Sequence, residues 1–326
     1  MVESSPSSHA APRDAQDSGH RTLADDQTRR GTWLAPLIPF PEAIAHLSAS
    51  DFLEIDGQRV FVRSTGEGFP LLMIHGFIAS HFSFRYLAPI LETQFRVILI
   101  DLNGFGYTER PMESVAYGIE TQADLLVRIL ETLGIQQAAI LGHSYGAAVA
   151  TFVAQRHPDR VSALILVSPA SKFDRLPWYY SLRLGRELVY LLCRRLLSDS
   201  AKYREIAKRA VFVDGIMTEA VAETYRRQLL IGGLKSTFLG YVEALLGKGI
   251  PPVPFASVPH PVLLLAGEQD AVIPLAQCHE ITEVLQNGTL VILSPCGHSA
   301  PEECPARVAK EVTSFFAGLD PLVLST

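Results

Sequence analysis

The chain has 326 residues, a formal net charge of −6 and 48% hydrophobic residues, enough for a folded domain with a large buried core. The negative charge and the wide spread of the arginines argue against nucleic-acid binding. No run approaches 18 uncharged apolar residues, so we expect no transmembrane segment.

The first thirty residues are rich in Ser, Ala, Asp and Arg and bury too little apolar surface to offset their ordering entropy. A proline-broken apolar stretch, Thr32 to Pro41, follows, and we expect it to pack on the protein body rather than to touch a membrane. The sequence thus predicts a disordered or extended segment over residues 1–45. The start lacks the apolar core of a secretory signal, so a cytoplasmic location is expected.

Strands and helices alternate from residue 51 onward. Asp56-Gly57 separates two strand-like runs, which predicts a β-hairpin, and Ile119 to Leu133 has helical periodicity with Gly134 as its stop. Apolar runs predict further strands at residues 71–74, 96–100, 138–141, 163–167, 263–267 and 290–293. We predict an α/β fold in which residues 46–170 and 257–326 form a mostly parallel central sheet covered by helices on both faces.

Residues 171–256 show helical patterns alone and predict an inserted all-helical lid, with helices at 179–197, 201–212, 218–231 and 234–246. This segment carries 14 Lys and Arg against 8 Asp and Glu, whereas the rest of the chain is acidic. A basic lid would suit the steering of an anionic substrate. A solvated helical surface is the simpler explanation of the same charges.

The segment Gly142-His143-Ser144-Tyr145-Gly146 lies between an apolar strand and a small-residue helix. A serine on a sharp strand-to-helix turn presents its hydroxyl outside the backbone, and glycine two residues away on either side avoids collisions. The pentapeptide alone is a weak signal, and the flanking strand and helix strengthen it. We predict that Ser144 is a nucleophile rather than a helix N-cap.

A serine hydroxyl needs a base to take its proton and an acid to orient that base. Asp270 follows the buried strand at 263–267, and His298 follows the strand at 290–293. The order Ser, Asp, His is expected when each residue follows a successive strand of one sheet. We therefore predict a catalytic triad of Ser144, Asp270 and His298, in preference to a turn aspartate and a surface histidine.

Six ordered segments together resemble the α/β-hydrolase family, in the capped branch that holds esterases, C–C bond hydrolases, haloperoxidases, haloalkane dehalogenases and epoxide hydrolases. The resemblance covers most of residues 51–318. The matching segments are His75-Gly76-Phe77, residues 101–108, the Ser144 pentapeptide, residues 157–161, residues 267–270 and Gly297-His298.

The resemblance implies an oxyanion hole made by the backbone N–H groups of Phe77 and Tyr145. It also implies that the chain is neither a dehalogenase nor an epoxide hydrolase, because those enzymes need a carboxylate where this chain has Ser144. His75 is expected to be structural. Asn103 replaces a proline that the family often has, and its effect on the loop is an open point.

His143, Trp178 and Tyr179 are candidate pocket residues, although hinge packing explains the two aromatic residues equally well. The four cysteines lack C-x-x-C spacing, so we expect free thiols, no metal site and no cofactor.

We predict a serine hydrolase that cleaves a small or medium hydrophobic ester through an acyl-enzyme. C–C bond hydrolysis of a diketo acid, cofactor-free haloperoxidase or perhydrolase activity, and ligand binding without turnover stay open as alternatives. The expected partner is a small-molecule acyl substrate, anionic if the basic lid steers it. Spacing leaves open whether the protein is a monomer or a homo-oligomer.

Overall fold

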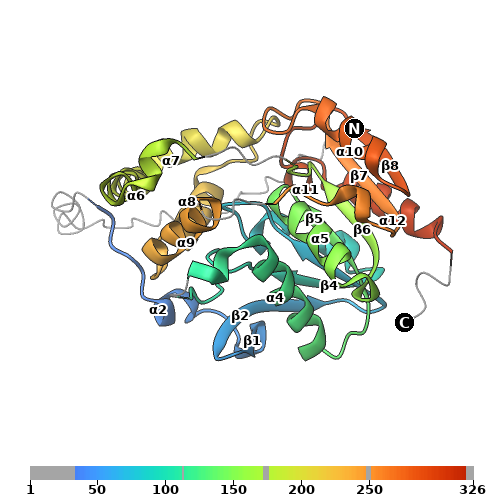
Figure 1. The fold of residues 1–326 in the computed structure, drawn as a ribbon, viewed down its shortest axis with the longest axis horizontal. Helices are drawn as coiled ribbons and strands as arrows, with labels where there is room; N and C mark the ends of the chain where they lie inside the picture. Colours follow the sequence, from blue (N-terminus) through green and yellow to red (C-terminus); the bar gives the residue numbers. More distant parts are fainter. Residues whose placement is uncertain (1–33, 112–113, 172–175, 247–250, 321–326) are drawn as a thin grey trace, which may run out of the picture. The chain divides into compact units, whose positions relative to one another are not determined.

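The computed structural model describes residues 34–111, 114–171, 176–246 and 251–320. It contains an eight-stranded sheet with the order β1-β2-β4-β3-β5-β6-β7-β8 (Figure 1). Both pairs that include β2 are antiparallel, and the other neighbouring pairs from β4 to β8 are parallel. The strands are β1 (Phe52–Ile55), β2 (Gln58–Thr65), β3 (Phe69–Ile74), β4 (Phe95–Ile100), β5 (Ala138–His143), β6 (Val161–Val167), β7 (Val262–Gly267) and β8 (Gly288–Leu293). The predicted fold class is confirmed.

The predicted hairpin is formed by β1 and β2, with Ile55 opposite Gln58. The two turn residues, Asp56 and Gly57, have φ values of 51° and 79°. Two successive residues with positive φ match the right-handed twist of the flanking strands, which explains why the Asp-Gly pair predicted this turn correctly.

Helices cover both faces of the sheet because successive strand residues point to opposite sides. Leu72 of β3 belongs to a buried cluster with Leu126 of α4 and Ala150 of α5. Its neighbour Leu71 belongs to a second cluster with Val312 of α12. The core helices are α3 (Ala88–Leu91), α4 (Ile119–Thr132), α5 (Tyr145–Arg156), α10 (Leu275–Val284), α11 (Ala300–Glu303) and α12 (Pro305–Ala317), with short 3-10 turns at His81–Phe84, Ser114–Tyr117, Pro158–Arg160 and Phe255–Ser257.

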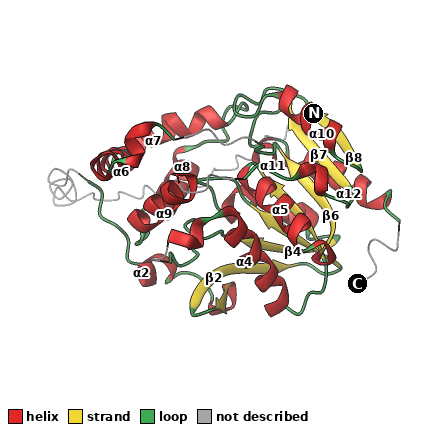
Figure 2. Ribbon diagram, in the orientation of Figure 1, coloured by secondary structure: helices red, strands yellow, loops and turns green. Residues whose placement is uncertain are grey.

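Between β6 and β7, the described residues form helices and loops, as Figure 2 shows. The α-helices are α6 (Arg183–Leu197), α7 (Ser200–Ala207), α8 (Glu219–Leu229) and α9 (Leu234–Leu246), with 3-10 turns at Trp178–Ser181 and Lys208–Ala210. The helix predicted from residue 179 begins only at Arg183, because Leu182 has an extended backbone that separates it from the preceding turn.

The amino-terminal apolar stretch packs on this helical insertion. Ile38 N–H donates to Leu230 O at 2.9 Å, and Ile38 O accepts from Gly232 N–H at 2.8 Å. The sequence predicted a disordered or extended segment over residues 1–45, of which residues 1–33 lie outside the described residues. Within the described part, Phe40–Ile44 form a short helix, α2. Pro41 lies in its first turn, where a missing N–H costs no helical hydrogen bond.

Candidate active site

Ser144 occupies the turn between β5 and α5. Its backbone has φ 53° and ψ −114°, a conformation that is strained for any residue with a side chain. Ser144 N–H donates to Val167 O at 2.9 Å, and Ser144 O accepts from Ala170 N–H at 3.2 Å. The strand, the helix and the neighbouring strand β6 therefore hold the serine in a turn that it would not adopt alone.

The two glycines around Ser144 are required by close backbone contacts. A Cβ atom on Gly142 would lie 2.4 Å from Gly146 O, and one on Gly146 would lie 2.4 Å from Ile74 O. Both distances are far inside van der Waals contact, and the opposing atoms belong to backbone that cannot swing away. The turn that carries Ser144 is thus packed directly against the end of β3.

Asp270 and His298 form a hydrogen-bonded pair at the carboxyl ends of β7 and β8. His298 Nδ1 lies 2.9 Å from Asp270 Oδ2, and both side chains are almost fully buried. Asp270 Oδ1 accepts backbone N–H bonds from Val272 and Ile273, each at 2.8 Å. Burial acts to raise the pKa of Asp270, but the hydrogen bond from His298 and these N–H groups outweigh it and lower the pKa. An ionised Asp270 holds the proton on His298 Nδ1 and leaves Nε2 available as a base.

His143 connects the serine turn to the histidine loop. Its Nε2 lies 2.8 Å from His298 O, and the two imidazole rings are 5.0 Å apart. Burial is the main cause that lowers the pKa of His143 to about 3, so the ring is neutral and its Nε2–H donates to that carbonyl. His143, a candidate pocket residue from the sequence, is thus buried and joined to the backbone of His298. Among the described residues, Ser144 Oγ has no hydrogen bond. In hydrolases without bound substrate, the distance from the serine Oγ to the histidine that acts as its base is often long.

The loop after β3 lies against the serine. A Cβ atom on Gly76 would be 3.3 Å from Ser144 Cβ and 3.2 Å from His143 Nδ1. Phe77 follows this glycine, and Tyr145 is the first residue of α5, so its N–H lies at a helix N-terminus. Both predicted oxyanion residues are therefore on segments that adjoin Ser144.

Three aromatic rings lie close to Phe77, and the sequence did not predict this cluster. Its ring centroid lies 5.1 Å from Tyr241, 5.3 Å from Phe105 and 5.8 Å from Tyr145. Tyr241 comes from α9, almost a hundred residues beyond Ser144, and its hydroxyl donates to Asn103 O at 3.1 Å. Spacing gives no hint of this contact, because the helical insertion brings it about.

Trp178 and Tyr179 lie on the 3-10 turn before α6 and are exposed. Their rings are 6.1 Å apart, and Tyr179 stacks on Tyr180 at 5.1 Å. In the described part of the chain, no ring contact or hydrogen bond joins either residue to the predicted triad.

His75 and Asn103 have structural roles in the described loops. His75 Nδ1 donates to Gly76 O at 2.7 Å, and its Nε2 accepts from Leu102 N–H at 3.1 Å. Asn103 N–H donates to Gln122 Oε1 at 3.1 Å, a bond that a proline at this position would lack. The departure at Asn103 thus adds a bond to α4.

Glu303 holds the loop that carries His298. Its carboxylate accepts N–H bonds from Gly297 at 3.0 Å and from Ser299 at 2.9 Å. It also accepts N–H bonds from Phe212 at 2.9 Å and Val213 at 3.0 Å in the helical insertion. One carboxylate therefore fixes both neighbours of His298 and ties them to the insertion.

We expect Glu303→Gln to lower kcat about tenfold and the free energy of unfolding by about 2 kcal/mol, because the amide NH₂ replaces one carboxylate oxygen and leaves at least one N–H donor, that of Ser299, unpaired. Ester hydrolysis and urea unfolding at pH 7 measure the two effects. The matched control is Glu283→Gln, at an exposed position of α10. Equal values for the two variants would contradict the positioning role.

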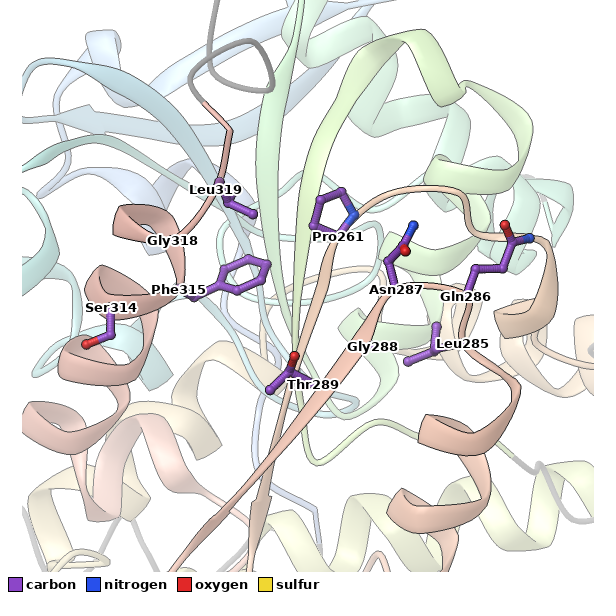
Figure 3. Close-up of a pocket in the computed structure, with 10 residues that line it drawn as sticks. All are labelled: Pro261, Leu285, Gln286, Asn287, Gly288, Thr289, Ser314, Phe315, Gly318 and Leu319. Carbon is purple, nitrogen blue, oxygen red and sulfur yellow. The ribbon is translucent and has the colours of Figure 1, made fainter.

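The described residues contain no cluster of three or more His, Cys, Asp or Glu side chains that is arranged to hold a metal ion. Within the same residues, no helix is long and apolar enough to cross a membrane. A surface hollow of about 540 Å³ lies near the amino ends of β7 and β8, away from the ends that carry Asp270 and His298 (Figure 3). Its lining includes Pro261, Gly288 and Phe315 and none of the predicted site residues.

Comparisons with known proteins agree with this architecture. Residues 70–190 match the family model described as alpha/beta hydrolase fold. The chain is 29% identical over 277 residues to 2-hydroxymuconate semialdehyde hydrolase of Pseudomonas sp. (strain CF600). The aligned region covers 82% of this chain and 94% of that relative. Similar solved structures include an epoxide hydrolase (TM-score 0.68, 24% identity, 82% of this chain and 98% of that one) and an esterase from Thermogutta terrifontis (TM-score 0.67, 22% identity, 84% and 98%). With the parallel sheet, these matches show that the chain has the α/β-hydrolase fold, and its similarity to named hydrolases makes it a hydrolase.

Proposed function

We propose that the protein is a serine hydrolase that cleaves a small or medium hydrophobic ester through an acyl-enzyme on Ser144. The observation that carries this proposal is the strained turn of Ser144 at the same end of the sheet as the Asp270–His298 pair. The three residues supply a nucleophile, a base and a group that orients the base.

In the proposed mechanism, His298 Nε2 takes the Ser144 proton as Oγ attacks the ester carbonyl, and Asp270 stabilises the imidazolium that forms. The N–H groups of Phe77 and Tyr145 then donate to the tetrahedral oxyanion, and each donor is worth about 3 kcal/mol of barrier. His298 returns the proton to the leaving alcohol. Water, activated by the same histidine, releases the acid and restores Ser144.

The ring cluster around Phe77 favours an uncharged substrate. Phe105 and Tyr241 are buried and pack against Phe77, whose 46% exposed ring beside the proposed oxyanion hole is the apolar surface that we propose for an acyl chain. The buried Arg110 is not available as a carboxylate ligand, because its guanidinium donates to Gln228 O at 2.6 Å and to Ile231 O. Tyr241 also supports the proposal that residues 171–256 act as a lid over a core of residues 46–170 and 257–326.

C–C bond hydrolysis of a diketo acid is the second candidate. It is favoured by the similarity to 2-hydroxymuconate semialdehyde hydrolase and to a 2-hydroxy-6-oxo-2,4-heptadienoate hydrolase, which is 24% identical over 267 residues. The same three residues would serve, with the leaving group a carbanion equivalent instead of an alkoxide. The two chemistries separate in a direct comparison of kcat/KM on hydrophobic esters and on a 2-hydroxy-6-oxo dienoate.

The proposal is tested by treating the protein with an alkyl fluorophosphonate and locating the adduct by peptide mass spectrometry. We expect one adduct per chain, on the peptide that contains Ser144, because only an activated serine reacts rapidly with such a reagent. The Ser144→Ala variant and heat-unfolded protein serve as controls, and neither should be labelled. Labelling at another residue, or an equal extent in the unfolded protein, would refute the nucleophile assignment.

A further inference from the structure

One face of α6 is apolar and exposed to solvent. Leu184, Leu188, Leu191 and Leu192 are 80%, 57%, 42% and 60% exposed, and we call these four residues the leucine face. Their spacing places them within about 100° of one another around the helix. Isolated exposed leucines are ordinary, but four on adjoining turns form the kind of contiguous patch that marks an interaction surface.

The orientation of α6 is fixed from its other side. Tyr190 and Leu197 are the buried residues of this helix, and the Tyr190 ring lies 5.9 Å from Phe238 of α9. Arg194 Nη2 also donates to Ala35 O at 2.5 Å. Figure 1 shows α6 at the outer end of the helical group. Rotating the helix to bury its leucines would break these contacts. The packing of its other side therefore keeps the leucine face exposed to solvent.

The outward face of α8 shows the ordinary pattern. Its exposed positions are Glu219, Ala220 and Arg227, while Val221 and Tyr225 are buried. The insertion thus does not expose an apolar face on every helix, although Ile206 of α7 is also 47% exposed.

The turn before α6 extends the apolar surface. Trp178 is 75% exposed and Leu182 is 51% exposed. A tryptophan with an accessible indole N–H is suited to the boundary between water and lipid acyl chains, where one part of the ring system is apolar and the other is wet.

The segment that contains this surface is cationic. Residues 183–209 contain eight Lys and Arg and three Asp and Glu, a net charge of +5 in a chain whose total is −6. Arg183 and Arg195 are exposed and stand at the two ends of the leucine face. Long arginine side chains can reach headgroup phosphates while the apolar face enters the lipid.

We propose that the leucine face of α6 binds the surface of a membrane that contains anionic lipids. A second copy of this chain is the competing occupant, because leucines at this spacing also suit helix pairing. A symmetric dimer through this face would bring two segments of charge +5 together, whereas the same charge attracts anionic headgroups. The proposal stands on α6, the turn before it and the charge of residues 183–209, and it does not depend on which bond the enzyme cleaves.

The test is flotation of the full-length protein with vesicles of phosphatidylcholine alone and with about 30% phosphatidylglycerol. We expect the vesicle-bound ratio to be roughly tenfold higher with the anionic vesicles at low salt and to fall as salt rises. The variant Leu184→Ser/Leu188→Ser/Leu192→Ser should lower binding to anionic vesicles at least about tenfold. Since these positions face solvent, its hydrolysis of a water-soluble short-chain ester should equal that of the wild type, which separates this test from the proposed function.

The matched control is Val284→Ser, which removes an exposed apolar side chain from α10 and should bind vesicles as the wild type does. The charge variant Arg183→Gln/Arg195→Gln should lose the preference for anionic vesicles while keeping weak binding to neutral ones. Wild-type protein that floats with neither vesicle, or a triple-serine variant that floats equally well, would overturn the proposal. Conversion of a wild-type dimer to a monomer by the triple substitution, without vesicle binding, would assign the face to a second copy instead.

Discussion

Replacing Ser144 with alanine is expected to lower kcat for p-nitrophenyl ester hydrolysis by about 10⁴- to 10⁶-fold. The reason is that the remaining groups, His298, Asp270 and the N–H donors, have no nucleophile to activate, so only the weak catalysis of an oriented water persists. The turn itself should survive, because alanine has the same Cβ atom at the strained φ of 53°.

The matched control for this prediction is Ser162→Ala in β6. Ser162 is buried in the same sheet, and its Oγ has no hydrogen-bond partner among the described residues, so the same substitution removes no bond. Its kcat should remain within a factor of two or so of the wild type. If Ser144→Ala kept more than about a tenth of the activity, the acyl-enzyme mechanism would have to be abandoned. If the wild-type protein hydrolysed the diketo acid but not the p-nitrophenyl esters, the second candidate function would be supported.

The second large effect is expected from Gly146→Ala, which should lower the free energy of unfolding by about 3 kcal/mol or more. The added Cβ would lie 2.4 Å from Ile74 O and 2.5 Å from His75 O, so α5 must shift away from β3. That shift also moves the N–H of Tyr145 relative to Phe77, so the remaining folded enzyme should be less active. Urea unfolding and the melting temperature, with an expected drop of roughly 6 to 12 °C, measure the change.

Gly232→Ala serves as the control for Gly146→Ala. A Cβ on Gly232 would meet nothing closer than Ile38 O at 3.6 Å, an ordinary van der Waals distance, and we expect its stability to stay within about 0.5 kcal/mol of the wild type. Equal stability of the two variants would show that the serine turn can open without cost and would contradict the close packing described above.

Local chemistry explains what the sequence predicted well. The Asp56-Gly57 turn, the glycines around Ser144 and the buried apolar strands are determined by backbone conformation and by burial of whole segments. These constraints act over a few residues, so they can be read without knowledge of the rest of the chain. The positions of Asp270 and His298 after their strands followed from the same reasoning.

Contacts between distant segments could not be predicted in this way. The carboxylate of Glu303 reaches Phe212, and the ring of Tyr241 reaches Phe77, only because the insertion folds back onto the core. The helical period of α6 predicted a helix but not which face is exposed, since an apolar face fits a protein interior, a partner or a lipid surface equally well. For the same reason, the sequence left open whether Trp178 and Tyr179 line a pocket or pack at a hinge, and in the structure both side chains are exposed.

The attachment of the amino-terminal segment to the insertion bears on product release. Ile38 is joined to the connection between α8 and α9 by two backbone hydrogen bonds, and Ala35 is joined to α6 through Arg194. Any swing of these helices away from the core must either carry residues 34–39 along or break those bonds. If the acid product leaves only when these helices swing away, residues 34–39 contribute to the turnover number. This segment precedes α6, the first helix that it restrains, by more than a hundred residues.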